Sequence, residues 1–123
     1  MRKDVASALR CVEALPGGDG LRAEFVFDPA LAVFRGHFPG DPILPGIFQV
    51  EMVRAAVDAL PGRRHEIAAI VKAKFSRRIM PGETVLLEAR WTDDGSGLLR
   101  VKATLSVEGE TAATISVTLK NLA

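Results

Sequence analysis

The chain has 123 residues and a mass of 13.2 kDa, is 48% hydrophobic and 25% charged, and carries a formal net charge of +1. This size indicates one globular domain over residues 1–123, and so small a net charge argues against a nucleic-acid-binding protein. One cysteine excludes an intrachain disulfide and is typical of a reducing compartment, and no apolar run is long enough to cross a bilayer. We therefore expect a cytoplasmic protein without a membrane segment.

The first predicted elements form a hairpin. Residues 7–15 and 21–27 alternate apolar and polar side chains, and the Gly-rich residues 16–20 between them are typical of a turn. Cys11 lies in the first of these strands, next to Arg10 and Val12, and no basic flank marks it as a reactive thiol. We expect Cys11 to be a small buried residue.

One long helix is predicted over residues 47–60, which contain no Gly or Pro and are followed directly by Pro61 and Gly62. Apolar residues cover most of its circumference, so we expect it to be largely buried. At 100° per residue, four side chains fall on one narrow sector: Ile47, Glu51, Arg54 and Asp58.

Four further strands are predicted over residues 66–77, 84–91, 98–107 and 111–119, and short turns join the last three into an antiparallel meander. A curved antiparallel sheet against one long helix is an α+β layout. Since the edges of such a sheet must be covered, we expect two sheets to pair edge to edge in a dimer.

The most informative segment covers residues 36–51 and reads GHFPGDPILPGIFQVE. Gly and Pro punctuate the chain strongly, so His37 is expected in a rigid loop, while Glu51 lies in the predicted helix. A neutral His can accept a proton near pH 7, and a carboxyl group among apolar side chains can stay protonated and donate one. His37 and Glu51 are therefore the candidates for proton transfer.

This segment resembles the signature of the beta-hydroxyacyl-acyl carrier protein dehydratases of type II fatty acid synthesis, approximately H-F-P-G-x-P-x-x-P-G-x-x-x-x-E. A second stretch, AKFSRRIMPGETV at residues 73–85, is similar to the K-F-R-R-P-V-x-P-G-D strand and turn of the same family. The resemblance implies a hotdog fold, in which a sheet wraps one long helix. It also implies a homodimer or a trimer of dimers that converts 3-hydroxyacyl-acyl carrier protein to the trans-2-enoyl form.

The resemblance assigns roles to individual residues. His37 of one chain would meet Glu51 of its partner, and the backbone N–H of Gly46 would bind the thioester carbonyl oxygen. The carbonyl of Ile43 would accept a hydrogen bond from the His ring, and Phe38 would lie in the same substrate site. The reaction needs no metal and no organic cofactor beyond the phosphopantetheine arm of the acyl carrier protein.

A basic stretch near the second motif is the candidate docking surface for that acidic carrier protein, as in the family; its residues are Lys72, Lys74, Arg77 and Arg78. The same residues are equally typical of the solvated face of a strand. His65, which follows two arginines in a polar stretch, is expected to be a solvated residue.

The chain also departs from the family pattern. It lacks the family's N-terminal stretch and any Tyr, has Ala55 in place of a common Gln, and carries Arg54 where a small residue is usual. These differences suggest a substrate from a polyketide or aryl polyene pathway. Arg54 could bind Glu51 and hold it ionised, or bind Asp58 and leave Glu51 free, and we favour the second pairing.

Two other functions fit the same fold. One is a hotdog acyl thioesterase, against which the H-F-P-G loop argues. The other is a non-catalytic hotdog subunit that binds acyl carrier protein or forms a heterodimer with an active homologue.

Overall fold

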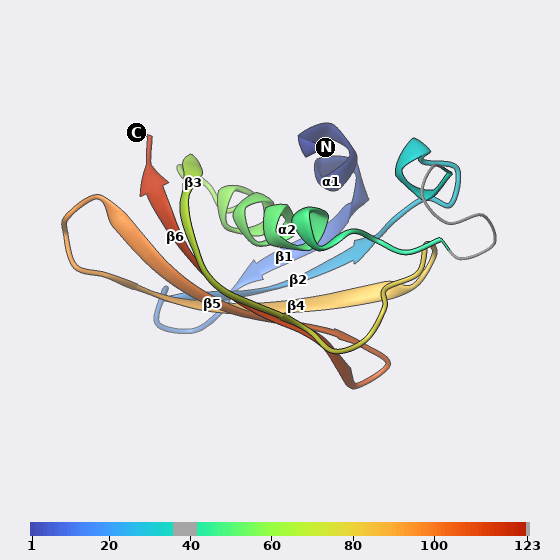
Figure 1. Cartoon of the computed structure of the whole chain (residues 1–123). Coiled ribbons are helices and arrows are strands. Elements are labelled where there is room, and N and C mark those ends of the chain that lie inside the picture. Colours follow the sequence, from blue (N-terminus) through green and yellow to red (C-terminus); the bar gives the residue numbers. More distant parts are fainter. Residues whose placement is uncertain (36–41, 123) are drawn as a thin grey trace.

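The computed structural model describes residues 1–35 and 42–122, and the elements in them are close to those expected. In chain order they are α1 (Arg2–Ala8), β1 (Leu9–Ala14), β2 (Gly20–Val26), a short 3-10 helix η1 (Ala32–Phe34), α2 (Gly46–Asp58), β3 (His65–Phe75), β4 (Thr84–Asp93), β5 (Leu98–Val107) and β6 (Glu110–Asn121). The strands form one antiparallel sheet in the order β1-β2-β4-β5-β6-β3. The sheet curves, and α2 lies against its concave face with α1 beside it (Figure 1).

The predicted hairpin and meander are both confirmed. β1 pairs with β2, while β4, β5 and β6 follow one another in the sheet through short turns. β3 pairs with β6 and forms one edge of the sheet, and two register shifts interrupt its pairing. This edge exposes three large apolar side chains, Ile70, Val71 and Phe75.

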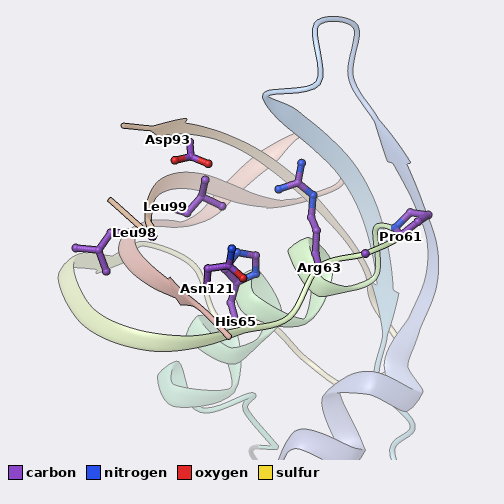
Figure 2. Close-up of a pocket in the computed structure, with 9 residues that line it drawn as sticks. Pro61, Arg63, His65, Asp93, Leu98, Leu99 and Asn121 are labelled. Carbon is purple, nitrogen blue, oxygen red and sulfur yellow. The ribbon is translucent and has the colours of Figure 1, made fainter. Parts of the chain in front are cut away.

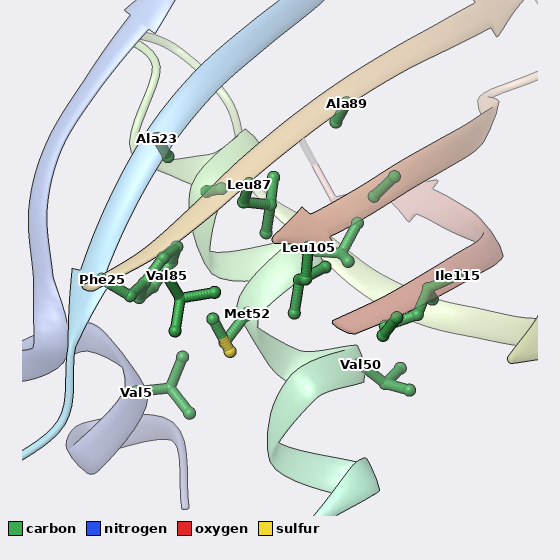
Figure 3. Close-up of a cluster of buried hydrophobic side chains, with 14 of the residues drawn as sticks. Val5, Ala23, Phe25, Val50, Met52, Val85, Leu87, Ala89, Leu105 and Ile115 are labelled. Carbon is green, nitrogen blue, oxygen red and sulfur yellow. The ribbon is translucent and has the colours of Figure 1, made fainter. Parts of the chain in front are cut away.

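The core lies between α2 and the concave face of the sheet (Figure 3). Eight of the 13 residues of α2 are buried, which confirms that the helix is largely enclosed. Met52 of α2 is fully buried in this core. Three of the eight buried residues are polar, namely Gln49, Glu51 and Arg54. The sheet therefore encloses polar as well as apolar side chains of the helix.

Two expectations for the N-terminal region were wrong. Residues 7 and 8 belong to α1 rather than to the first strand, because Val5 and Ala8 form one apolar face, which is buried in the core. Cys11 is exposed rather than buried. It lies on β1, the other edge of the sheet, where Leu9 and Val12 provide the side chains that pack on the core.

A loop that connects β3 to β4 is held by one arginine. Arg77 donates to both carboxylate oxygens of Glu83, at 3.1 and 2.9 Å, and to Glu110 at 3.0 Å. Glu83 also accepts from the backbone N–H of Met80 at 2.7 Å. The hydrogen bond from Arg77 holds the pKa of Glu83 below its usual range, and the hydrogen bond to Glu83 raises the pKa of Arg77. The ion pair between Arg77 and Glu83 in this loop therefore makes a pH-dependent contribution to the free energy of unfolding.

No helix in residues 1–35 and 42–122 is both long enough and apolar enough to cross a membrane.

Glu83→Gln should destabilise the protein by about 1–2 kcal/mol at pH 7, because it removes the charged acceptor of the Arg77 hydrogen bonds. Since the pKa of Glu83 is lower in the folded protein than its ordinary value of 4.5, its contribution is present above that pH and is lost as the pH falls through the folded value. Urea unfolding should show that the difference in free energy of unfolding between variant and wild type is smaller at pH 3 than at pH 7. A difference that is the same at both pH values would contradict this account.

Candidate functional site

Glu51 and Arg54 of α2 are buried, and both form ion pairs within the chain. Glu51 is 2% exposed, and Arg54 donates from Nε to its Oε1 at 2.7 Å and from Nη2 to its Oε2. The Nη1 group of Arg54 donates to Asp58 Oδ2 at 2.8 Å. The hydrogen bonding that Arg54 donates to Glu51 is the main cause that raises the pKa of Arg54.

The expectation that Arg54 would pair with Asp58 and leave Glu51 free was therefore wrong in its second half. The pairing with Asp58 is present, but the same guanidinium also binds Glu51 through two hydrogen bonds. On a helix, residues three and four positions apart are neighbours, so a single arginine reaches both carboxylates. A buried ionised carboxylate without a partner would cost several kcal/mol, which favours the double contact.

His65 is buried, contrary to the expectation that it would be solvated. It is 6% exposed, and its ring Nδ1 lies 2.7 Å from Asp58 Oδ1. Its backbone N–H donates to Asp58 Oδ2 at 2.9 Å. The turn at Pro61 and Gly62 brings the chain back from the end of α2, and this return places the first residue of β3 beside the last residue of the helix.

The His65 ring lines a polar pocket of about 260 Å³ at this end of the molecule (Figure 2). Arg63, Asp93 and Asn121 are among the other residues that line it. Arg63 also stacks on the ring of Trp91, with its guanidinium carbon 5.1 Å from the ring centroid.

The opposite end of α2 opens on a groove of about 400 Å³. Ile43 and Gly46 line it together with Phe75 of β3, so the structure brings two of the predicted substrate-binding residues to one place. Gly46 begins the helix, and the N–H groups of a first helical turn have no acceptor within the helix and carry partial positive charge. A Cβ at position 46 would lie 2.8 Å from Phe75 Cζ, so glycine leaves the room that the ring occupies.

Arg77 and Arg78 line the same groove, which places part of the predicted docking surface beside Gly46. Lys72 and Lys74 are exposed on β3 and are not among the groove residues. The charge of Arg77 is already offset by Glu83 and Glu110. His37 and Phe38 lie outside the described residues, so their predicted roles stay predictions.

Sequence reasoning missed Gln49, which lies five residues before Arg54 on α2 and lines the groove. Its side chain is buried, and its Nε2 donates to the carbonyl of Leu44 at 3.3 Å. Its Oε1 accepts no hydrogen bond from any described part of the chain. The sequence did contain a signal for this residue, because Gln49 is a polar residue in a helix that is predicted to be largely buried.

Across residues 1–35 and 42–122, no three His, Cys, Asp or Glu side chains gather in a group that could hold a metal ion.

Arg54→Met should lower the free energy of unfolding by about 3 kcal/mol, because it leaves a buried carboxylate without its cation. Adding Glu51→Leu to this variant should restore most of the loss, since no buried charge then lacks its cation at that position. The matched control is Arg22→Met, which removes an exposed ion pair with Glu88 at 3.1 Å and should cost under about 0.5 kcal/mol. Urea unfolding of the wild type and the three variants measures these changes. Equal losses in Arg54→Met and Arg22→Met would show that the buried pair contributes no more to stability than the exposed pair.

Comparison with known proteins places this architecture in a family. The family model ApeI-like, described as ApeI dehydratase, matches residues 15–115. The 3-hydroxyacyl-[acyl-carrier-protein] dehydratase FabZ of Sodalis glossinidius is 36% identical over 93 residues, covering 68% of this chain and 62% of that protein. FabZ of Pectobacterium atrosepticum is 34% identical with the same coverage. The chain thus spans about 62% of the length of these relatives.

Among solved structures, the dehydratase heterocomplex ApeI:P from Xenorhabdus doucetiae superposes with a TM-score of 0.71 and 31% identity, covering 91% of this chain and 96% of that one. A putative thioesterase from Ralstonia eutropha has a TM-score of 0.66 at 20% identity, with 89% and 83% coverage, which is a likeness of fold. Together these neighbours confirm the hotdog fold. The match over residues 15–115 and the likeness to ApeI:P show that the chain belongs to the ApeI-like dehydratase family.

Proposed function

We propose that this chain removes water from 3-hydroxyacyl groups carried on acyl carrier protein, giving the trans-2-enoyl product. The observation that carries the proposal is a buried carboxyl group, Glu51, on the same helix whose N-terminus opens on a groove at Gly46. The family membership supports the reaction class. Fatty acid synthesis and a polyketide or aryl polyene pathway both use such substrates.

The proposed chemistry needs three groups. His37 takes the proton from C2 of the acyl chain, and Glu51 donates a proton to the hydroxyl at C3, which leaves as water. The N–H of Gly46 stabilises the negative charge that develops on the thioester oxygen, since a helix N-terminus directs partial positive charge toward it. We expect His37 and Glu51 to come from different subunits, as in the family that the sequence resembles.

The contact between Arg54 and Glu51 is compatible with an acid at position 51 because Arg54 has a second carboxylate. When Glu51 carries a proton, the pair formed by Arg54 and Asp58, with 2.8 Å between Nη1 and Oδ2, remains complete. The buried cation is then still compensated. Protonation of Glu51 therefore does not leave an unpaired charge in the core.

The groove beside Gly46 is the proposed path of the phosphopantetheine arm, with Arg78 and the exposed Lys72 and Lys74 receiving the acidic carrier protein. We expect no metal ion and no organic cofactor beyond that arm. A cytoplasmic location is part of the same proposal.

A second hotdog chain is the expected partner at the edge strand β3. Long edge strands with exposed apolar side chains are pairing sites, and β3 exposes Ile70, Val71 and Phe75. The related dehydratase ApeI:P is a heterocomplex. A homodimer, a trimer of dimers and a heterodimer with another hotdog protein all satisfy this edge.

One observation favours a second candidate function. Because Arg54 binds Glu51 through two hydrogen bonds, the chain could serve as a non-catalytic subunit that supports an active homologue or holds acyl carrier protein. The thioesterase reading is not favoured, since its support is a likeness of fold.

His37→Ala and Glu51→Gln should each reduce formation of the enoyl product by about 10²–10⁴-fold, because each removes one partner of the proton transfer. Mass spectrometry of 3-hydroxyacyl carrier proteins detects the reaction as the loss of one water, and Glu66→Gln, on the exposed part of β3, is the matched control. Near wild-type turnover in either variant would overturn the assignment. A chain that is inactive until a second hotdog subunit is added would support the second function, and free acid as the product would indicate a thioesterase.

Reversing two charges, Lys72→Glu together with Lys74→Glu, should raise KM for a carrier-linked substrate about tenfold while leaving kcat near wild type. The same acyl group on a short pantetheine thioester should be unaffected, because it lacks the carrier protein. The effect should shrink as salt is raised. Lys102→Glu on β5 is the control, and an equal KM effect from that variant would exclude a specific docking surface.

A further inference from the structure

Four side chains form a continuous line of hydrogen bonds along α2 and onto β3. Glu51 binds Arg54, Arg54 binds Asp58 at 2.8 Å, and Asp58 binds the His65 ring at 2.7 Å. Both carboxylate oxygens of Asp58 are used, because Oδ2 also accepts the backbone N–H of His65. The line begins at the proposed catalytic acid and ends in the polar pocket at the other end of the helix (Figure 2).

A count of charges shows that one added proton makes this line of side chains neutral. With Glu51 and Asp58 ionised, Arg54 charged and His65 neutral, the four groups carry a net charge of −1. One proton on Glu51 or on His65 makes the cluster neutral, which is the state that a buried site favours. Because an ionised carboxylate can only accept, the Nδ1 of His65 donates to Asp58, and Nε2 is the ring atom that gains or loses the proton.

The other elements packed on α2 add no charge to this line within the described chain. The residues of α1 buried there are Val5 and Ala8, and the buried residues of β2 and β6 are apolar or glycine. Around His65, the charged groups are Arg63 and Asp93, which line the pocket from the preceding loop and from β4. The neighbours of His65 in the chain, Arg64 and Glu66, are exposed.

We propose that Asp58 and His65 are positioning residues that act through Arg54 on Glu51, and that His65 competes with Glu51 for one shared proton. Because Asp58 also binds Arg54, Arg54 stabilises the ionised form of Glu51 less strongly. Glu51 can therefore stay protonated until it donates that proton. A proton on His65 offsets the negative charge of Asp58, so that Arg54 again stabilises the ionised form of Glu51. The role in turnover rests on the dehydratase function proposed above, whereas the coupling between the two sites does not.

The first test follows the His65 ring by NMR as the pH is changed. The chain has two histidines, so His65→Gln assigns the two sets of ring signals. In Glu51→Gln, Asp58 becomes the sole carboxylate bound to Arg54, and the pH at which half of the His65 rings are protonated should fall by about 0.5, a roughly threefold loss in proton affinity. Glu66→Gln is the matched control, because Glu66 adjoins His65 in the chain but is exposed, and it should produce a clearly smaller shift.

The second test uses the pH profile of kcat. In Asp58→Asn, Arg54 has Glu51 as its remaining carboxylate, so the alkaline limb of the profile should move about one pH unit lower, a roughly tenfold loss of kcat on that limb. Asp93→Asn makes the same chemical change at a residue that lines the His65 pocket without binding Arg54, and its profile should match the wild type. A simple loss of stability would lower activity at every pH and would not move the limb.

Equal His65 shifts in Glu51→Gln and Glu66→Gln would overturn the proposal, as would an alkaline limb that Asp58→Asn leaves in place. If Asp58→Asn does not fold, the NMR comparison decides alone. A protein that shows the larger shift in Glu51→Gln but dehydrates no substrate would retain the coupling and refute the proposed function.

Discussion

The arrangement of two carboxylates around one buried guanidinium is the constraint on which the candidate site depends. Glu51 and Arg54 lie on a helix that the curved sheet encloses, so neither can be left alone without a large desolvation cost. Asp58 lies nearer to the surface, with a side chain that is 17% exposed. The charge of Arg54 is therefore divided between a deeply buried partner and one closer to water. Any proton that Glu51 gains or loses changes this balance directly.

The fold supplies the other parts of the site by placing both ends of α2 against β3. At the start of the helix, Phe75 packs on Gly46 and helps to form the groove. At its end, the short turn after the helix brings His65 to Asp58. β3 is also an edge strand, so a partner chain that pairs with it would adjoin the groove and the polar pocket alike. Assembly and proton balance are thus connected through a single strand.

The sequence predicted the elements well because their signals are local. Alternation marked the strands, Pro61 and Gly62 marked the end of the helix, and the motif located Gly46 and Glu51. The pairing of Arg54 with Glu51 was considered but not favoured, because it depends on how deeply the sheet encloses the helix, which the spacing alone does not give. His65 was misjudged for a related reason. Its two arginine neighbours indicate solvent, but the turn places its ring against Asp58.

Arg54 changes how an acid can be maintained in such a helix. With a small residue at position 54, a buried carboxyl group is kept neutral by desolvation alone, because ionising it would place an uncompensated charge in the core. An arginine there would reverse that preference if Glu51 were its sole partner. Asp58 removes the conflict, since the pair it forms with Arg54 is neutral by itself and leaves Glu51 free to be neutral as well. If Glu51 is the acid of the proposed reaction, the buried Arg54 therefore requires Asp58 as a second carboxylate one turn further along the helix.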